Sequence, residues 1–120
     1  MLKTGILLGS FFSLMTIVLG AFGAHALKEQ LSEYGQSIYD KAVLYQMFHT
    51  IAILLLGVIE KFIPEVQIQI VGVAFLLGIL IFSGSLYILA ITGMKWLGMI
   101  TPIGGLLFII GWVLLFLKVL

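Results

Sequence analysis

The sequence predicts an all-α integral membrane protein, a four-helix bundle with a short interfacial amphipathic helix between spans one and two. Charged side chains are absent between Lys3 and Lys28, between Glu65 and Lys95, and between Lys95 and Lys118. A helix of about 20 apolar residues crosses the hydrocarbon core of a bilayer. Composition agrees, because charged residues make up 9% of the chain and mean hydropathy is +1.30. A water-soluble domain of 120 residues could not hide three such runs and keep a polar surface.

Composition also excludes several classes of function. The net charge of +1 gives no reason to expect a nucleic-acid partner or an acidic substrate. The chain has no arginine, so a guanidinium clamp on phosphate or carboxylate is excluded. It has no cysteine, which excludes disulfides, thiolate metal sites and cysteine nucleophiles. We expect one membrane domain over residues 1–120.

The first predicted span runs from Thr4 to Ala26 and carries a stripe of small residues. Their spacing of three or four places them near one face of a helix. Small residues let a second helix approach closely, so we expect this face to contact protein rather than lipid. The stripe comprises Gly5, Gly9, Ser13, Thr16, Gly20 and Ala24.

The segment from Leu27 to Asp40 separates this span from the next and holds most of the acidic residues. Its apolar residues follow helical spacing, which is typical of an amphipathic helix at the membrane interface. We therefore expect a short interfacial helix whose apolar face comprises Leu27, Leu31, Tyr34 and Ile38.

Three further spans are predicted at Lys41–Lys61, Val66–Thr92 and Met99–Leu120. Pro64 follows the second span, where proline cannot continue the helical hydrogen bonds. Pro102 falls in the first turn of the fourth span, where its missing N–H costs little. Short links make consecutive spans antiparallel neighbours.

Polar side chains in the second and third spans form the candidate site. Polar groups inside membrane helices turn away from lipid and find partners, so we expect them to converge in one half of the bundle. His25, at the exit of the first span, belongs to the same half. The candidate ligand-binding residues are His25, Tyr45, Gln46, His49, Ser83, Ser85 and Tyr87.

His49 is the central residue of this hypothesis. Low dielectric disfavours a charged imidazolium, so we expect the ring to be buried and neutral at pH 7. A neutral imidazole has one donor and one acceptor, and both need partners. The expected partners are Gln46 or a residue of the third span.

Several interpretations of these residues stay open. The polar groups can form a purely structural network between helices. They can line a pocket for a small molecule, a lipid or an ion. His25 and His49 could instead ligate haem iron or a metal, although their difference in depth counts against a shared ligand plane. A hydrolase is disfavoured because no Asp or Glu lies in the interior of a span, and Glu60 is at the very end of the second one.

Four motifs in order resemble a known family. They are Gly20-Ala-Phe-Gly-Ala-His-Ala-Leu27, Tyr45-Gln-x-x-His49, Phe82-Ser-Gly-Ser-Leu-Tyr-x-Leu-Ala-x-Thr-Gly93 and Thr101-Pro-Ile-Gly-Gly105, the last followed by Gly111-Trp112. The chain resembles the small bacterial membrane proteins grouped as domain of unknown function 423, which look related to the transmembrane protein 256 group. The resemblance implies a multi-span membrane protein of the bacterial cytoplasmic membrane and supplies no substrate.

The leading functional hypothesis is a non-enzymatic membrane protein whose polar pocket binds a small molecule or lipid in a transport or accessory role. The alternatives are a bis-histidine cofactor protein and a purely structural membrane subunit. Expected partners are the lipid bilayer, a small-molecule or lipid ligand and a second copy of the chain, with no nucleic acid. No cofactor and no resident metal are expected.

Overall fold

The computed structural model describes residues 2–120, and this part of the chain is helical without strands. Four helical stretches are long and apolar enough to cross a membrane. The predicted fold class, an all-α integral membrane four-helix bundle, is therefore confirmed. In chain order the elements are α1 (Leu2–His25), α2 (Glu33–Phe62), α3 (Gln69–Gly78), the π-helical turn η1 (Ile79–Ser83), α4 (Gly84–Thr92), the 3₁₀ helix η2 (Lys95–Met99) and α5 (Thr101–Val119).

Local sequence signals explain several helix ends. Ser32 caps α2, since its hydroxyl accepts a hydrogen bond from the backbone N–H of Gly35 at 2.9 Å. α4 ends at Gly93, which has a φ of 71° and so adopts the left-handed conformation that glycine tolerates best. Pro102 lies in the first turn of α5, as predicted.

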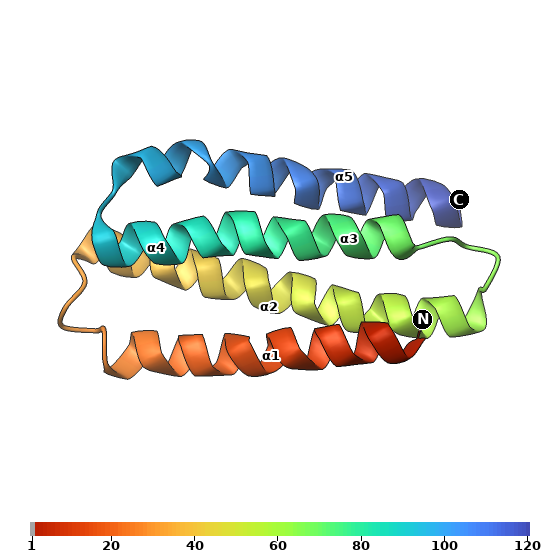
Figure 1. The fold of residues 1–120 in the computed structure, drawn as a ribbon, viewed down its shortest axis with the longest axis horizontal. Helices are drawn as coiled ribbons and strands as arrows, with labels where there is room; N and C mark the ends of the chain where they lie inside the picture. The colour runs from red at the N-terminus through yellow and green to blue at the C-terminus, as the bar shows by residue number, and fades with distance from the viewer. Residues whose placement is uncertain (1) are drawn as a thin grey trace.

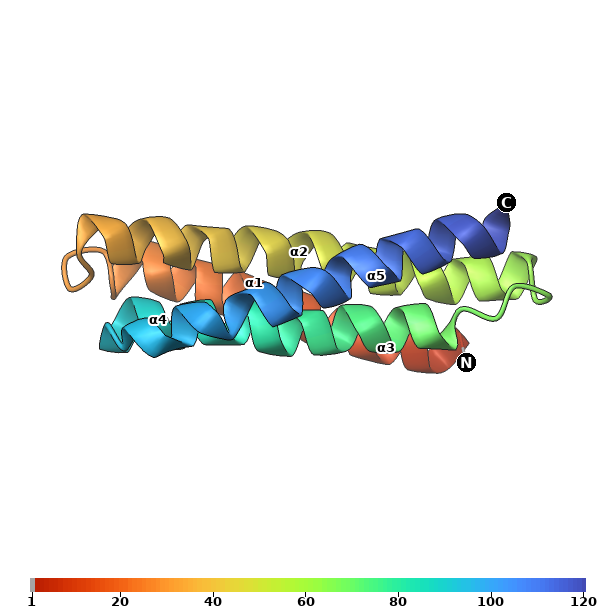
Figure 2. The same ribbon diagram turned by 90° about the horizontal axis from the view of Figure 1, so that it is seen from above.

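The helices form an antiparallel bundle with a central pair. Figure 1 shows α1 and α5 on opposite sides of α2 and the α3–η1–α4 span. Seen from above, α5 crosses obliquely over the other helices (Figure 2). α1 packs mainly on α2, and α5 packs mainly on α3 and η1. The two outer spans consequently leave most of their surface for lipid.

Glycines bring α1 close to α2. A Cβ atom added to Gly5 would lie 3.1 Å from Cα of Gly57, and one added to Gly9 would lie 2.5 Å from the Leu54 side chain. Thr16 is also buried. Toward the end of α1 the contact departs from the predicted stripe. Gly23 meets the Tyr39 ring of α2, whereas Ala24 is exposed.

Glycines also bring α5 against the third span. A Cβ atom on Gly104 would lie only 2.4 Å from the backbone nitrogen of Phe82, inside the π-helical turn η1. Gly78 and Gly111 make room for the rings of Phe108 and Phe75 respectively. Backbone, rather than side chain, therefore fixes the contact between α5 and η1.

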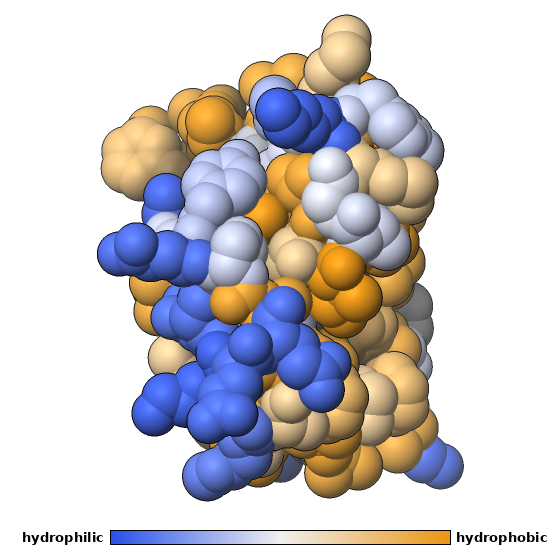
Figure 3. Space-filling view, turned by 90° about the vertical axis from the view of Figure 1, so that its left-hand side faces the viewer, coloured by the Kyte–Doolittle hydropathy of each residue, from blue (hydrophilic) through white to orange (hydrophobic). Residues whose placement is uncertain are grey.

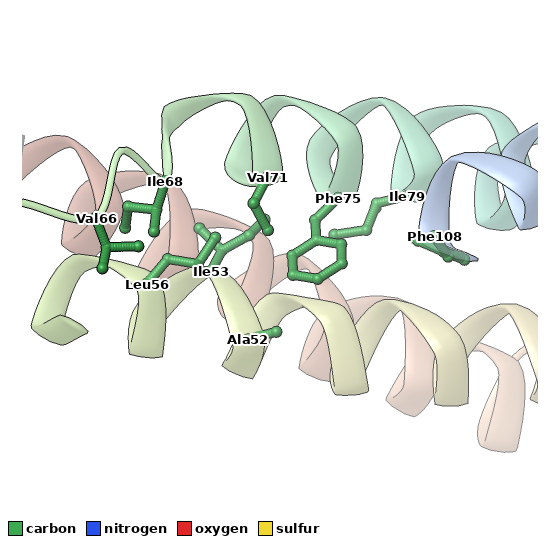
Figure 4. Close-up of a cluster of buried hydrophobic side chains, with 9 residues drawn as sticks. All are labelled: Ala52, Ile53, Leu56, Val66, Ile68, Val71, Phe75, Ile79 and Phe108. Atoms are coloured by element: carbon green, nitrogen blue, oxygen red, sulfur yellow. The ribbon is translucent and has the colours of Figure 1, made fainter. Parts of the chain in front are cut away.

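The half of the bundle away from the α1–α2 connection has an apolar core. Figure 4 shows it between α2, α3, η1 and α5, with the Phe75 ring facing α2. Its buried members are Ala52, Ile53, Leu56, Val66, Ile68, Val71, Phe75, Ile79 and Phe108. The polar side chains of the spans lie mostly in the other half.

The predicted interfacial helix is wrong. Residues 26–31 form turns and bends, Ser32 is the cap, and Glu33 already starts α2. Tyr34, expected on the apolar face, is exposed, whereas Leu27 and Ile38 are buried. Tyr34 and Ile38 of the predicted face lie in the first turns of the long membrane helix α2, which begins after the Ser32 cap. Leu27 and Leu31 lie in the connection before that cap.

Charged residues gather at the two ends of the bundle. Figure 3 looks onto the end with the α1–α2 connection, where hydrophilic residues cover much of the surface. Lys28, Glu29 and Glu33 are exposed there. Along α2, about 28 Å of helix separates Lys41 from Glu60 at 1.5 Å per residue. That length matches the ~30 Å hydrocarbon core, so the first two turns of α2 extend beyond it.

Candidate functional site

His49 lies near the middle of α2 and is 3% exposed. Its Nδ1 atom lies 2.8 Å from the carbonyl oxygen of Tyr45. The indole Nε1–H of Trp112 donates to His49 Nε2 at 3.0 Å. An indole nitrogen can only donate, so Nε2 must be unprotonated and Nδ1 must carry the proton. The geometry therefore describes a neutral imidazole with both nitrogens satisfied.

The predicted partners of His49 are wrong. The ring bonds to its own helix and to α5, not to Gln46 or the third span. The bond to Trp112 spans two helices that are not adjacent in the chain. His49 is thus a bridge between α2 and α5.

Aromatic rings surround the imidazole. Phe108 stacks on it with ring centroids 3.5 Å apart and planes 8° apart. Phe48 and Phe75 meet it edge-on, with centroids 5.2 Å and 5.3 Å away. These contacts fix the ring plane and exclude water, which favours the neutral form.

A groove opens between α2 and α5 above this bridge. Its volume is about 700 Å³, within the usual range for small-molecule sites. Half of its lining residues have aromatic rings, and α5 contributes two small residues, Pro102 and Gly105. The groove opens to the lipid side of the bundle, since Phe48 and Ile109 on its rim are exposed. Its lining residues are Tyr45, Phe48, His49, Phe82, Pro102, Gly105, Leu106, Phe108, Ile109 and Trp112.

Tyr45 supplies the free polar group of this groove. Its ring packs on Phe82 with centroids 4.6 Å apart, and 42% of the residue is exposed. Within residues 2–120 its hydroxyl has no hydrogen-bond partner, in contrast to His49 and Trp112. The groove therefore offers an aromatic surface and one phenol that can donate or accept.

Gln46 of α2 bonds to α1 rather than lining the groove, and Tyr87 of α4 bonds to Gln46. The Tyr87 hydroxyl donates to Gln46 Oε1 at 2.7 Å, and Gln46 Nε2 donates to the carbonyl oxygen of Phe12 at 3.3 Å. Tyr39 donates from its hydroxyl to the carbonyl oxygen of Leu19 in α1. These bonds connect α1, α2 and α4, and Gln46 does not line the groove.

The two serines of the third span bond to different helices. Ser83 donates to the carbonyl oxygen of Ala42 at 2.7 Å, joining η1 to α2. Ser85 lies 2.6 Å from the hydroxyl of Thr101, joining α4 to α5. Ser83 and Ser85 therefore connect neighbouring helices and stay outside the groove.

The predicted site residues thus separate into groups. Tyr45 and His49 share the groove, whereas Gln46, Ser83, Ser85 and Tyr87 tie helices together elsewhere. His25 is exposed at the end of α1. The neighbouring Gly23 packs on Tyr39, which lies about 15 Å from His49 along α2 at 1.5 Å per residue.

This separation counts against a shared haem or metal site for the two histidines. His49 Nε2 is already occupied by the Trp112 indole. Within residues 2–120 no group of three His, Asp or Glu side chains could hold a metal ion. The geometry gives a bis-histidine interpretation no support.

Trp112 is the site residue that sequence reasoning missed. The signal was present, because Trp112 is the sole tryptophan placed well inside a predicted span. A buried indole N–H needs an acceptor, and few acceptors lie inside the spans. Phe108 and Phe82 were missed because phenylalanine is ordinary in a membrane helix.

Comparison with known proteins decides the family. Residues 19–105 match the family described as Protein of unknown function (DUF423). The chain belongs to this DUF423 family. The family match covers all four motifs, including Tyr45 and His49, and ends before Gly111 and Trp112.

Curated relatives of this DUF423 chain are named as membrane proteins. A UPF0382 membrane protein of Staphylococcus haemolyticus is 46% identical over 117 residues, covering 98% of this chain and 95% of the relative. One of Staphylococcus aureus (strain bovine RF122 / ET3-1) is 46% identical over 114 residues, covering 95% and 93%. No solved structure matches the chain. Together with the four apolar helices, these relatives show a multi-pass membrane protein.

Proposed function

We propose that this integral membrane protein is non-enzymatic and binds a lipid-soluble small molecule in the groove between α2 and α5. The ligand class is a planar apolar body with one hydrogen-bonding group. A transport or accessory role in the bacterial cytoplasmic membrane fits such a protein. The observation that carries the proposal is the open, aromatic groove of about 700 Å³ with the free Tyr45 hydroxyl on its wall.

The chemistry of the groove selects the ligand. Aromatic rings favour offset or edge-on contact with another planar ring. Tyr45 can then hydrogen-bond to a carbonyl or hydroxyl of that molecule. Non-enzymatic binding fits because every ring nitrogen of His49 and Trp112 is already hydrogen-bonded. The Trp112 indole donates to His49 Nε2, and His49 Nδ1 bonds to the carbonyl oxygen of Tyr45. Both residues line the groove, and neither has a free ring nitrogen that could transfer a proton to a ligand.

The test uses 1,4-naphthoquinone, which is planar, carries carbonyl acceptors and quenches tryptophan fluorescence. The full chain carries Trp96→Phe, so that Trp112 in the groove is the sole reporter. We expect saturable quenching in nanodiscs. Gly105→Leu should abolish saturable quenching, because the Leu side chain fills the groove. The helix contact should survive, because a Cβ atom at Gly105 would lie 3.7 Å from the Phe82 ring, an ordinary contact distance.

Gly84→Leu is the matched control. Gly84 lies on α4 and does not line the groove, and no atom of residues 2–120 outside its own stretch of helix lies within 4 Å of an added Cβ. Saturable quenching should persist in this variant and weaken in Tyr45→Phe. Non-saturable quenching in the unmodified groove, or equal quenching in the Gly105→Leu variant, would contradict the proposal.

His49 variants separate ligand binding from a purely structural bridge. His49→Gln keeps an acceptor for the Trp112 indole, whereas His49→Leu removes it. A groove that binds ligand should lose saturable quenching in both variants while the helical fold persists in the Gln variant. A purely structural bridge predicts a change in stability for His49→Leu alone.

A further inference from the structure

A second cavity lies at the opposite end of the bundle, between α1, α2 and α3. We propose that it binds a phospholipid. The part of one acyl chain nearest the headgroup fills the cavity, and the headgroup ammonium donates to the Glu60 carboxylate. The cavity, here called the glycine slot, has a volume of about 170 Å³. It is lined by Thr4, Gly5, Leu8, Ile53, Leu56, Gly57, Glu60, Ile68, Gln69, Gly72, Val73 and Leu76.

Missing side chains create the slot. Gly5, Gly57 and Gly72 place a glycine on each of three helices at the same depth. Gly5 and Gly57 are in backbone contact, so α1 leans on α2 at this level. At Gly72 there is space, since within the described part of the chain an added Cβ atom would meet only the Leu56 side chain, at 3.7 Å. The space lies between α1 and α3 at the end of the bundle shown with the N-terminus in Figure 1.

The surroundings determine what fills this space. Its interior is apolar, so water would find too few polar partners there. An empty gap would forfeit the dispersion contacts of its walls. In a bilayer, the mobile apolar group available at this depth is a lipid acyl chain. The slot reaches from Glu60, at the edge of the hydrocarbon zone, inward to Leu8 and Leu76.

The rim selects the headgroup. Among residues 2–120, Glu60 is the one charged residue that lines the slot. Gln69 Nε2 donates to its Oε1 atom at 2.8 Å, which orients the carboxylate across the start of α3. An oriented carboxylate at the membrane surface complements an ammonium that can donate hydrogen bonds. This favours phosphatidylethanolamine over phosphatidylglycerol, which is anionic, and over phosphatidylcholine, whose quaternary nitrogen has no N–H.

Native mass spectrometry of the full chain tests the proposal. The protein in mild detergent is incubated with equal amounts of phosphatidylethanolamine, phosphatidylcholine and phosphatidylglycerol. We expect preferential retention of one phosphatidylethanolamine. Gly72→Leu should reduce retention several-fold, and Gly72→Ala, which has room for its methyl group, should reduce it less. Gly84→Leu, outside the slot, should retain lipid as the unmodified chain does.

Glu60→Gln tests the headgroup assignment by itself. The Gln side chain keeps an oxygen that accepts from Gln69, so the local structure is preserved. We expect phosphatidylethanolamine to lose its advantage over phosphatidylglycerol while total retention is unchanged. Equal retention by the Gly72 variants and the unmodified chain would overturn the slot. Preference for phosphatidylglycerol, or an unchanged preference in Glu60→Gln, would overturn the headgroup assignment. Because the slot and the α2–α5 groove share no lining residue, Gly105→Leu should leave lipid retention unchanged.

Discussion

The hydrogen bond between Trp112 and His49 connects two helices whose backbones make few close contacts with each other. Each partner satisfies the other's hydrogen-bonding requirement, because a buried imidazole nitrogen needs a donor and a buried indole N–H needs an acceptor. Inside lipid such bonds contribute ~0.6 kcal/mol on average, with the largest near 1.7. The bridge therefore specifies how α5 rotates on α2 more than it adds stability.

Removing the indole N–H tests this bond. Trp112→Phe keeps an aromatic ring next to Phe75 and Phe48 but leaves His49 Nε2 without a donor. We expect the free energy of unfolding in detergent to fall by about 1 kcal/mol. Trp96→Phe is the matched control, since Trp96 is 57% exposed on η2. Equal stability of the two variants would show that the bond contributes nothing.

At the scale of elements, α5 depends on glycine where it meets η1. A Cβ atom at Gly104 would lie 2.4 Å from the Phe82 backbone nitrogen, and backbone cannot swing aside as a side chain can. The π-helical turn inserts an extra residue into the span, and such turns often occur near functional sites. Here the turn sets Phe82 against both Gly104 and the Tyr45 ring of the groove.

Two adjacent glycines provide a sharp test of this contact. Gly104→Ala should lower the free energy of unfolding by about 1–3 kcal/mol through overpacking. Gly105→Ala should change it little, because its added Cβ would lie 3.7 Å from the Phe82 ring. Thermal unfolding of both variants in the same detergent measures the difference. If Gly104→Ala unfolds at the temperature of Gly105→Ala, the close contact is not required.

The sequence predicted the spans well because charge is excluded from hydrocarbon, and the charge-free runs mark that zone directly. It failed at Glu33–Asp40, where charged residues of a long helix in the interfacial zone look like a separate interfacial helix. It also grouped Gln46 with His49 by helical proximity. Those residues face different helices, and only the packing of α1 and α5 on opposite sides of α2 separates them. The stripe on α1 was predicted from spacing alone. At its end the structure places Gly23, rather than the predicted Ala24, against α2.

At the scale of the whole molecule, the charges at both ends position the bundle in the bilayer. Between Lys41 and Glu60 the sole titratable side chains of α2 are Tyr45 and the His49 imidazole of the bridge. Glu33 lies about 12 Å beyond Lys41 along the helix axis. α2 should therefore emerge from the membrane for two turns next to the connection from α1.

Cysteine accessibility tests this placement. Glu33→Cys should react with a membrane-impermeant maleimide applied from one side of intact membranes. Leu55→Cys should be protected from both sides, although 55% of Leu55 is exposed on the isolated molecule, because lipid covers it. Detergent solubilisation provides the control, since both cysteines should then be closer in reactivity. Labelling of Leu55→Cys in intact membranes would contradict the four-span arrangement.

The central claim is that a neutral His49 bridges α2 to α5 beneath the groove. Solid-state NMR of the chain in bilayers at pH 7, with ¹⁵N-labelled histidine and tryptophan, tests it most directly. His25→Gln, a change at an exposed residue, leaves His49 as the single imidazole. We predict one protonated ring nitrogen, Nδ1, and one unprotonated nitrogen, Nε2, in contact with the Trp112 indole proton. Two protonated ring nitrogens, or an Nε2 atom without that indole contact, would contradict the account.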